Sequence, residues 1–582
     1  MHLSTLDWSI VGVSLSTTVV IGLLVSKRSS ASSGSYFLAS RNMPWWLLGF
    51  SMVATTFAAD TPNLVTNLVR SQGVAGNWAW WSFLLTGMLT TFVYARLWRR
   101  LGVTTDVEFY EKRYSGQAAR FLRGFRALYL GGFFNIMIMA NVTLAAIKIG
   151  SVLLDLSPFT IVVGAGLITM LFSTAGGFLG VLITDLFLFL LAMTGSLLAA
   201  YFAVNHPSIG GLGALLEHPN VLGKTGILPD MSDPEQFIPL LIIPFAVQWW
   251  SVWYPGAEPG GGGYIAQRML AAKTENHAIG ASAFFNFCHY AVRPWPWILV
   301  ALASLVVFPD LESLKAALPS VPEHLVQDDL AYSAMLTFLP HGILGIVVAS
   351  LVSAYVSTIS TSLNWGASYF VNDFYARFIV PGASEKQQVL VGRLATVALM
   401  VLAGAVALLL ESALQAFQIL LSIGAGTGLL FLLRWFWLRI NVWSEISAML
   451  LSFVISVFFE FGPYSDLPAW QKLVTSVTLT TLGWVTVTLL TSATDQTRLN
   501  SFSATVKADP TELKSGGLVA LVSTFGIYAT LFCVGALLYG NYAIAAVLLV
   551  AAIAATLLTR RFVQNTETEQ VPAPALAGQK SH

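Results

Sequence analysis

Charged side chains are scarce in this chain of 582 residues. They make up 10% of the sequence, whereas hydrophobic residues make up 56%, and a soluble protein carries about a quarter charged residues. This composition excludes a soluble globular protein. The 30 lysines and arginines are balanced by 29 aspartates and glutamates, so the chain also lacks the basic excess that is typical of nucleic-acid-binding proteins.

Cysteine is almost absent as well. The two cysteines, Cys288 and Cys533, each lie in an apolar run, which excludes a disulfide framework and a cysteine-rich metal site. The nucleophile and zinc motifs of common hydrolases are missing too. We therefore predict a protein that is not an enzyme.

Long apolar segments fill the chain instead. A membrane-spanning helix needs about 20 mostly apolar residues, and we predict fifteen such spans. Most lysines and arginines fall in alternate loops, and positively charged loops tend to stay in the cytoplasm. The sequence therefore predicts an all-α polytopic protein of the plasma (inner) membrane, with its N-terminus outside and its C-terminus cytoplasmic.

Two of the predicted spans are interrupted by helix-breaking residues. Asp60 and Pro62 stand in the middle of the second span, and proline removes a backbone donor and disfavours helix at the residue before it. The seventh span runs into two prolines and a run of glycines around Glu258. A simple proline kink is the alternative for Pro62, and a phosphate-binding loop for the glycines, although no GK[ST] sequence follows them.

Breaks at matching places in two halves are typical of transporters built from inverted repeats. We predict a five-plus-five inverted-repeat core with broken first and sixth core helices, one extra N-terminal helix and about four extra C-terminal helices. The predicted divisions are an N-terminal helix and cytoplasmic loop at 1–42, a first repeat at 43–205, an extracytoplasmic loop at 206–236, a second repeat at 237–440, additional helices at 441–563 and a disordered tail at 564–582.

The ninth span is rich in hydroxyl groups. Ser357 and Thr358 lie three and four residues after Ala354, so one helical face offers a backbone carbonyl and two hydroxyls. A hard cation such as sodium prefers oxygen ligands. The alternative is that these hydroxyls bond to their own helix or join neighbouring helices.

Four ionisable residues lie inside predicted spans apart from the breaks. Asp185 is flanked by apolar residues, and intramembrane carboxylates are costly and commonly functional. A neutral structural aspartate is the alternative. The roles of Lys148, His289 and Arg293 stay open at this point.

Five segments of the chain resemble motifs of the sodium:solute symporter family, which includes sodium-coupled proline, galactose, sialic acid and myo-inositol transporters. They are PWWLLGFSMVATTFAAD, DVEFYEKRY, STAGGFLGVLITD, YIAQRMLAAKT and GILGIVVASLVSAYVSTISTSLNWGASYFVNDFY. They occur in the family's order over more than 400 residues. Leu188, Ala79 and the long glycine-rich segment depart from the family's pattern, which weakens any assignment of the solute.

The resemblance implies sodium as the coupling ion (Na+). It implies a principal sodium site at Ala54, Phe57, Ala354, Ser357 and Thr358. It also implies a second sodium site, present in some members, at Asp185, Ser357, Ser360 and Thr361.

The candidate solute-binding residues come partly from the resemblance and partly from the chemistry of carboxylates at membrane depth. Asn141 matches a solute-contacting position of the family, and carboxylates at membrane depth need hydrogen-bond donors such as hydroxyl or amino groups. We also expect Trp78 or Trp81 to stack on the solute, with a simple interfacial aromatic belt as the alternative. The full predicted set is Asp60, Thr61, Trp78, Trp81, Asn141, Tyr254, Glu258 and Gln418.

Together these features predict a secondary active transporter. We expect sodium-coupled symport of a small polar solute, namely a sugar, polyol or amino acid, by alternating access. A proton-coupled symporter of the same fold and a transport-fold sensor are the alternatives. The expected partners are the solute, sodium ions and membrane lipid, with no nucleic acid and no obligatory protein partner.

Overall fold

Helices are the only regular elements in the described part of the computed structural model, which comprises residues 3–29, 41–103, 105–173, 178–252, 258–424 and 426–569. One isolated bridge joins Met43 to Ala272. The all-α prediction is confirmed. The predicted tail at 564–582 lies mostly outside the described residues.

The first half of the chain contributes α1 (Thr5–Ser29), α3 (Trp45–Thr56), α4 (Asp60–Gln72), η2 (Val74–Asn77), α5 (Trp78–Trp81), α6 (Leu84–Leu89), η3 (Thr90–Tyr94), α7 (Ala95–Leu101), α8 (Glu108–Arg113), α9 (Gly116–Leu128), η4 (Tyr129–Phe134), α10 (Asn135–Leu153), α11 (Pro158–Ser173) and α12 (Phe178–Val204). The connection to the second half contains α13 (Leu212–Glu217), α14 (Pro219–Leu222) and α15 (Pro234–Phe237).

The second half contributes η5 (Ile238–Ile242), α16 (Ile243–Ala246), η6 (Gln248–Trp250), α17 (Gly263–Ala271), α18 (Glu275–Phe287), η7 (Cys288–Val292), α19 (Pro294–Val307), α20 (Leu311–Ala317), η8 (Glu323–Leu325), α21 (Leu330–Leu336), α22 (Ile343–Ser368), η9 (Tyr369–Ile379), α23 (Glu385–Ala407), α24 (Ala413–Gly424) and α25 (Gly428–Leu433). The C-terminal helices are α26 (Val442–Phe461), α27 (Ala469–Leu490), α28 (Gln496–Val506), α29 (Pro510–Leu538) and α30 (Tyr542–Glu569).

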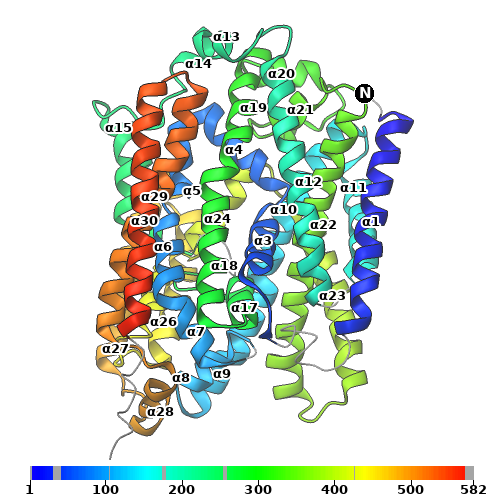
Figure 1. Ribbon diagram of the computed structural model, residues 1–582. Coiled ribbons are helices and arrows are strands. Elements are labelled where there is room, and N and C mark those ends of the chain that lie inside the picture. The colour runs from blue at the N-terminus through cyan, green and yellow to red at the C-terminus, as the bar shows by residue number, and fades with distance from the viewer. Residues whose placement is uncertain are drawn as a thin grey trace, which may run out of the picture.

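The helices form one bundle, and further helices cover its two ends (Figure 1). Helix α1 runs along one edge against α12 and α22, whereas α29 and α30 pair with each other at the opposite edge. The short helices α13, α14 and α20 cover the end where α1 begins, and α8, α9 and α28 cover the other end.

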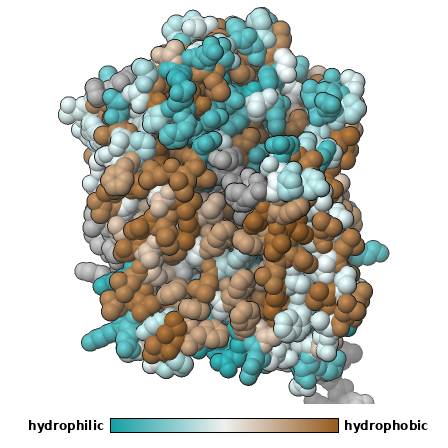
Figure 2. Space-filling view, turned by 180° about the vertical axis from the view of Figure 1, so that it is seen from behind, coloured by the Kyte–Doolittle hydropathy of each residue, from teal (hydrophilic) through white to brown (hydrophobic). Residues whose placement is uncertain are grey.

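Hydrophobic side chains form a broad band across the middle of the bundle, and hydrophilic side chains gather at its ends (Figure 2). Within the described residues, nine helices are long and apolar enough to cross a membrane by length and composition. The chain is an integral membrane protein. Fifteen spans remain a prediction, because several of the predicted segments are divided into shorter helices, at 43–68, 77–97, 237–256 and 413–434.

Both predicted helix breaks are present. Helix α3 ends at Thr56, and α4 begins at Asp60, so Pro62 lies in the first turn of α4, where its missing N–H group leaves no hydrogen bond unmade. The helical segment before the glycine-rich sequence ends at Trp250, and α17 begins at Gly263. The inverted-repeat relation between the halves, and the divisions proposed above, remain predictions.

Candidate functional site

The break between α3 and α4 lies against the hydroxyl-rich face of α22. The Thr358 hydroxyl donates a hydrogen bond to the Thr55 carbonyl over 3.1 Å. The Phe57 N–H group donates to the carbonyls of Val53 and Ala54, which close the last turn of α3. The predicted principal sodium ligands Ala54, Phe57, Ala354, Ser357 and Thr358 are all buried. The fold thus brings the end of α3 and the middle of α22 together.

Asp185 of α12 faces the same region from the opposite side. Its carboxylate accepts hydrogen bonds from Ser357 over 2.7 Å and from Ser51 over 2.6 Å. The Ser360 hydroxyl donates to the Ser357 carbonyl, while the buried Thr361 hydroxyl has no hydrogen-bond partner among the described residues. Carboxylate, hydroxyl and carbonyl oxygens are the donor set that a hard cation prefers.

Sequence reasoning missed two groups beside this carboxylate. Arg268 of α17 lies 4.0 Å from the Asp185 carboxylate and donates hydrogen bonds to the Ser51 hydroxyl. The guanidinium partly balances the buried negative charge. Arg268 and Asp185 lie far apart in the sequence, so no local pattern connects them.

A small inner cavity of about 50 Å³ lies beside the start of α4. Asn141 of α10 donates a hydrogen bond to the Asp60 carboxylate over 2.5 Å. The second carboxylate oxygen of Asp60 and the amide oxygen of Asn141 are buried without hydrogen-bond partners in the described structure. Thr61 also lines this cavity. The site therefore presents unused acceptor oxygens.

Two basic side chains also line the inner cavity. His289 and Arg293 line it, and the Arg293 guanidinium lies 3.3 Å from the His289 ring nitrogen Nε2. That guanidinium also stacks over the rings of Phe57 and Trp297. The roles of both basic residues were open from sequence, and the fold places them in the lining of the same cavity as Asp60.

Asp60 and Glu258 were predicted together as solute-binding residues, but Glu258 does not line the inner cavity with Asp60. Its carboxylate forms a buried ion pair with Arg126 of α9 over 2.6 Å. The nearby Asp106 carboxylate accepts hydrogen bonds from the Gly263 N–H group and from the Tyr369 hydroxyl. The acid of the second break therefore joins helices at the end of the bundle that carries α8 and α9.

A more exposed ion-pair cluster lies at the same end. Glu111 of α8 accepts hydrogen bonds from Arg123 over 2.7 Å and from Arg377 over 2.6 Å. Burial by itself raises the pKa of Glu111, but the hydrogen bonds and charges of the two arginines outweigh it, and the pKa is lowered. These contacts hold α8, α9 and η9 together.

The tryptophan that lines the inner cavity is not one of the two predicted. Trp80 lines the inner cavity, whereas Trp78 donates its ring N–H to the Ile227 carbonyl over 2.9 Å. Trp81 is fully buried against Trp78 and Phe532. In this conformation neither Trp78 nor Trp81 reaches the inner cavity. Tyr254 lies outside the described residues.

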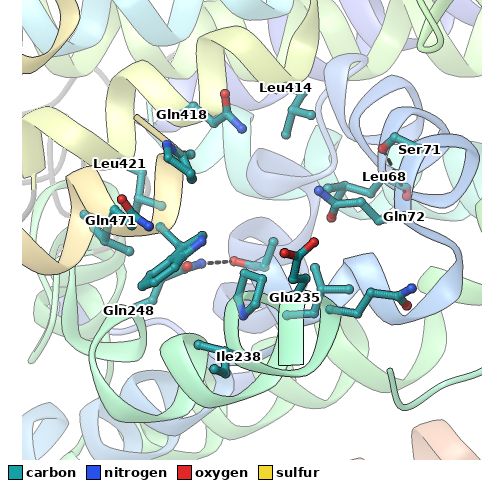
Figure 3. A pocket seen from close by; sticks show the side chains of 18 of the residues that line it. Leu68, Ser71, Gln72, Glu235, Ile238, Gln248, Leu414, Gln418, Leu421 and Gln471 are labelled. Carbon is teal, nitrogen blue, oxygen red and sulfur yellow. Dashed lines mark hydrogen bonds between the residues drawn. The ribbon is translucent and has the colours of Figure 1, made fainter. Parts of the chain in front are cut away.

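A wider cavity of about 950 Å³ opens at the end of the bundle where α1 begins (Figure 3). It is lined by the end of α4, by α15, α24 and the start of α27. Gln418 of α24 lines this vestibule and not the inner cavity. Phe417, the preceding residue, lines both, so the two spaces adjoin at α24.

Known proteins match most of the chain. The family model "Sodium:solute symporter family" matches residues 36–451. A sodium/glucose cotransporter of Vibrio parahaemolyticus is 26% identical over 85% of this chain and 92% of its own length. The human sodium/myo-inositol cotransporter 2 is 26% identical over 78% of this chain and 72% of its own.

A solved structure has the same fold. It is a substrate-bound, outward-open sodium-coupled sialic acid symporter, with a TM-score of 0.65, 18% identity, and coverage of 85% of this chain and 99% of that one. The chain therefore belongs to the sodium:solute symporter family, whose members are sodium-coupled membrane transporters and not enzymes.

Proposed function

We propose that this protein takes up a small polar solute, a sugar, polyol or amino acid, together with sodium by alternating access. The observation that carries the proposal is the inner cavity beside the helix break. Asp60, Thr61 and Asn141 offer acceptor oxygens there, and Arg293 and His289 also line the cavity. A solute that both donates and accepts hydrogen bonds suits such a lining better than an apolar one.

Sodium binding is proposed next to that cavity. The principal site uses Ala54, Phe57, Ala354, Ser357 and Thr358, and the second uses Asp185, Ser357, Ser360 and Thr361. The contact of Thr358 with the Thr55 carbonyl supports the first, because it places the α22 hydroxyls at the unwound end of α3. An ion that joins α3 to α22 stabilises the arrangement that also forms the solute cavity, which couples the two ligands.

The conformation supports the direction of transport. We propose that the N-terminus lies outside, so the vestibule opens to the outside and Phe417 closes the inner cavity beneath it. The Arg126–Glu258 ion pair then closes the cytoplasmic end. Reporter fusions at the C-terminus check the orientation, because a reporter active only outside the cytoplasm should stay silent.

The decisive test is solute uptake into proteoliposomes. A sodium gradient should drive uptake of at least one solute from a panel of sugars, polyols and amino acids, and a potassium gradient should not. An inside-negative potential should increase the uptake, since each charge gains about 2.3 kcal/mol per 100 mV. Uptake driven by a pH gradient without sodium would contradict the proposal.

Two variants test whether the inner cavity binds the transported solute. Asn141→Ala removes a polar group from the lining and should raise the solute concentration at half-maximal uptake. Gln117→Leu changes an exposed glutamine on α9 and serves as the control, with uptake like that of the wild type.

A further inference from the structure

Arg268 of α17 supplies the positive charge beside Asp185. Its guanidinium lies 4.0 Å from the Asp185 carboxylate, and both side chains are buried. Within the described part of the chain, no other basic side chain forms an ion pair with this carboxylate. A buried charge without a partner is costly, so the guanidinium balances Asp185 when no ion is bound there.

The guanidinium is held in place by hydroxyl groups of α3. Its Nε and Nη2 atoms donate hydrogen bonds to the Ser51 hydroxyl over 3.2 and 3.1 Å. That hydroxyl in turn donates to the Asp185 carboxylate over 2.6 Å. Nη2 also donates to the Thr55 hydroxyl over 3.4 Å. Ser51 therefore bridges the two charges, which are close together but not in direct hydrogen-bond contact.

The second sodium site proposed above uses the same carboxylate. Ser357 donates a hydrogen bond to the Asp185 oxygen that Ser51 does not contact. The Thr361 hydroxyl is buried and has no hydrogen-bond partner in the described structure, so it is available to an ion. A sodium ion at these groups brings a second positive charge to a carboxylate that one cation already balances. Like charges repel strongly in a poorly solvated interior.

Arg268 also connects this site to the second helix break. It lies on the short helix α17, which begins at Gly263, directly after the glycine-rich segment. The Gly263 N–H group donates to the Asp106 carboxylate over 2.8 Å, and the Trp98 ring N–H donates to the Gly260 carbonyl over 2.8 Å. One end of α17 is thus tied to the end of the bundle that carries α8 and α9, and its side chain Arg268 is tied to α3 and α12.

We propose that Arg268 is a tethered cation that alternates with the second sodium ion at Asp185, a role that rests on the second sodium site proposed above. In the sodium-free protein the guanidinium balances the carboxylate, and a sodium ion that binds there displaces it. The displaced side chain keeps two acceptors on its own helix, because Nη1 already donates to the Tyr264 carbonyl over 3.4 Å and to the Gln267 side chain over 3.1 Å.

This alternation has two consequences for the transport cycle. Asp185 has a counter-charge in both the loaded and the empty transporter, so the empty transporter changes conformation without an unpaired buried charge. In addition, sodium removes the contact that ties α17 to α12 and α3. The helix that follows the glycine-rich break is therefore released in the loaded protein, before the cytoplasmic end opens.

Equilibrium binding of radioactive sodium to the purified full-length protein in lipid nanodiscs tests the competition. Arg268→Gln removes the charge and keeps an amide that can bond to Ser51. The second sodium ion should bind this variant about tenfold or more tightly than the wild type, because a unit charge a few ångströms away in a poorly solvated site has at least that effect. Arg268→Lys keeps the charge and should bind sodium like the wild type.

Two further variants make the result specific. Arg70→Gln is the matched control, because Arg70 is also a buried arginine, paired with Asp328 over 2.8 Å, and contacts no proposed sodium ligand. It should lower the melting temperature and leave sodium affinity unchanged. In an Asp185→Asn background, Arg268→Gln should have no effect on the one sodium ion that remains.

Hydrogen exchange of the wild-type protein tests the connection to α17 without any substitution at Arg268. Sodium should increase amide exchange in peptides that cover α17, compared with potassium at the same ionic strength, because a helix that loses a tertiary contact opens more often. Asp185→Asn should abolish this increase. The measurement stands even if Arg268→Gln does not fold.

Three results would overturn this role of Arg268. The first is a second sodium ion that binds Arg268→Gln and the wild type with equal affinity, which would leave the second sodium site intact. The second is exchange in α17 that sodium leaves unchanged or slows. The third is a single bound sodium ion in both proteins, which would refute the second site as well. Sodium-driven uptake depends on the principal site and is tested separately.

Discussion

Replacing Lys148 by methionine should destabilise the protein strongly. The Lys148 ammonium group of α10 lies 2.5 Å from the Asp329 carboxylate just before α21, and both side chains are fully buried. The other Asp329 oxygen accepts a hydrogen bond from the Ala413 N–H group, the first residue of α24. Removing one partner of a buried ion pair costs about 3–5 kcal/mol, because the remaining charge is left unpaired.

The assay is thermal unfolding in detergent, followed by intrinsic tryptophan fluorescence. Lys148→Met should melt at a clearly lower temperature than the wild type. Lys315→Met is the matched control, because Lys315 and Glu323 also form an ion pair, at 2.6 Å, but both are exposed, and solvent screens such a pair. We expect no measurable change in the control.

A double variant tests the reason for the loss. Lys148→Met/Asp329→Leu removes both charges and should recover most of the stability, apart from about 1–3 kcal/mol for the Ala413 N–H group that loses its acceptor. If Lys148→Met melted like the control, or if the double variant were less stable than the single one, the argument from an unpaired buried charge would be refuted.

The remaining predictions concern transport. Ser357→Ala and Thr358→Ala should each raise the half-saturating sodium concentration for uptake, and an unchanged value in both would move the ion site elsewhere. Asp185→Asn should lower the sodium Hill coefficient towards one in a protein that still folds, whereas a wild-type stoichiometry of one sodium ion would rule out the second site. Asp60→Asn should reduce solute affinity about tenfold to a hundredfold, since a buried acceptor is lost, and unaltered affinity would remove Asp60 from the solute site. Glu258→Gln should leave solute affinity in the outward-facing state nearly unchanged and increase labelling of cysteines introduced at the cytoplasmic end, because its partner is Arg126; equal labelling would contradict a closing role.

The fold was largely predictable because the bilayer restricts what an apolar chain can form. The break near Pro62 and the second break around Glu258 follow from proline and glycine chemistry, and the structure has both. The hydroxyl face of α22 follows from helical spacing. These features depend on residues close together in the sequence, where periodicity and backbone chemistry are informative.

The solute site was harder to predict, because periodicity does not say which helix faces which. Trp78, Trp80 and Trp81 lie in the four-residue helix α5, which follows a turn of 3₁₀ helix. The change of helical pitch alters the direction of successive side chains, so the cavity receives Trp80. Glu258 and Arg126 are 132 residues apart, and no local pattern connects them.

Three of the buried ion pairs share a feature that depends on these long-range contacts. Arg126–Glu258, Lys148–Asp329 and Arg268–Asp185 each join a residue of the predicted first repeat to one of the predicted second. A buried ion pair contributes little net stability compared with an apolar pair of the same size. It does, however, raise the free energy of every arrangement in which the two buried charges separate. Three such pairs thus favour one register between the halves. The pair at the end opposite the vestibule, Arg126–Glu258, must separate if that end opens. The sodium and solute sites proposed above lie near Asp185 and Asp60, where the halves also meet. The free energy of binding at those sites would then be available at the interface that alternating access has to rearrange.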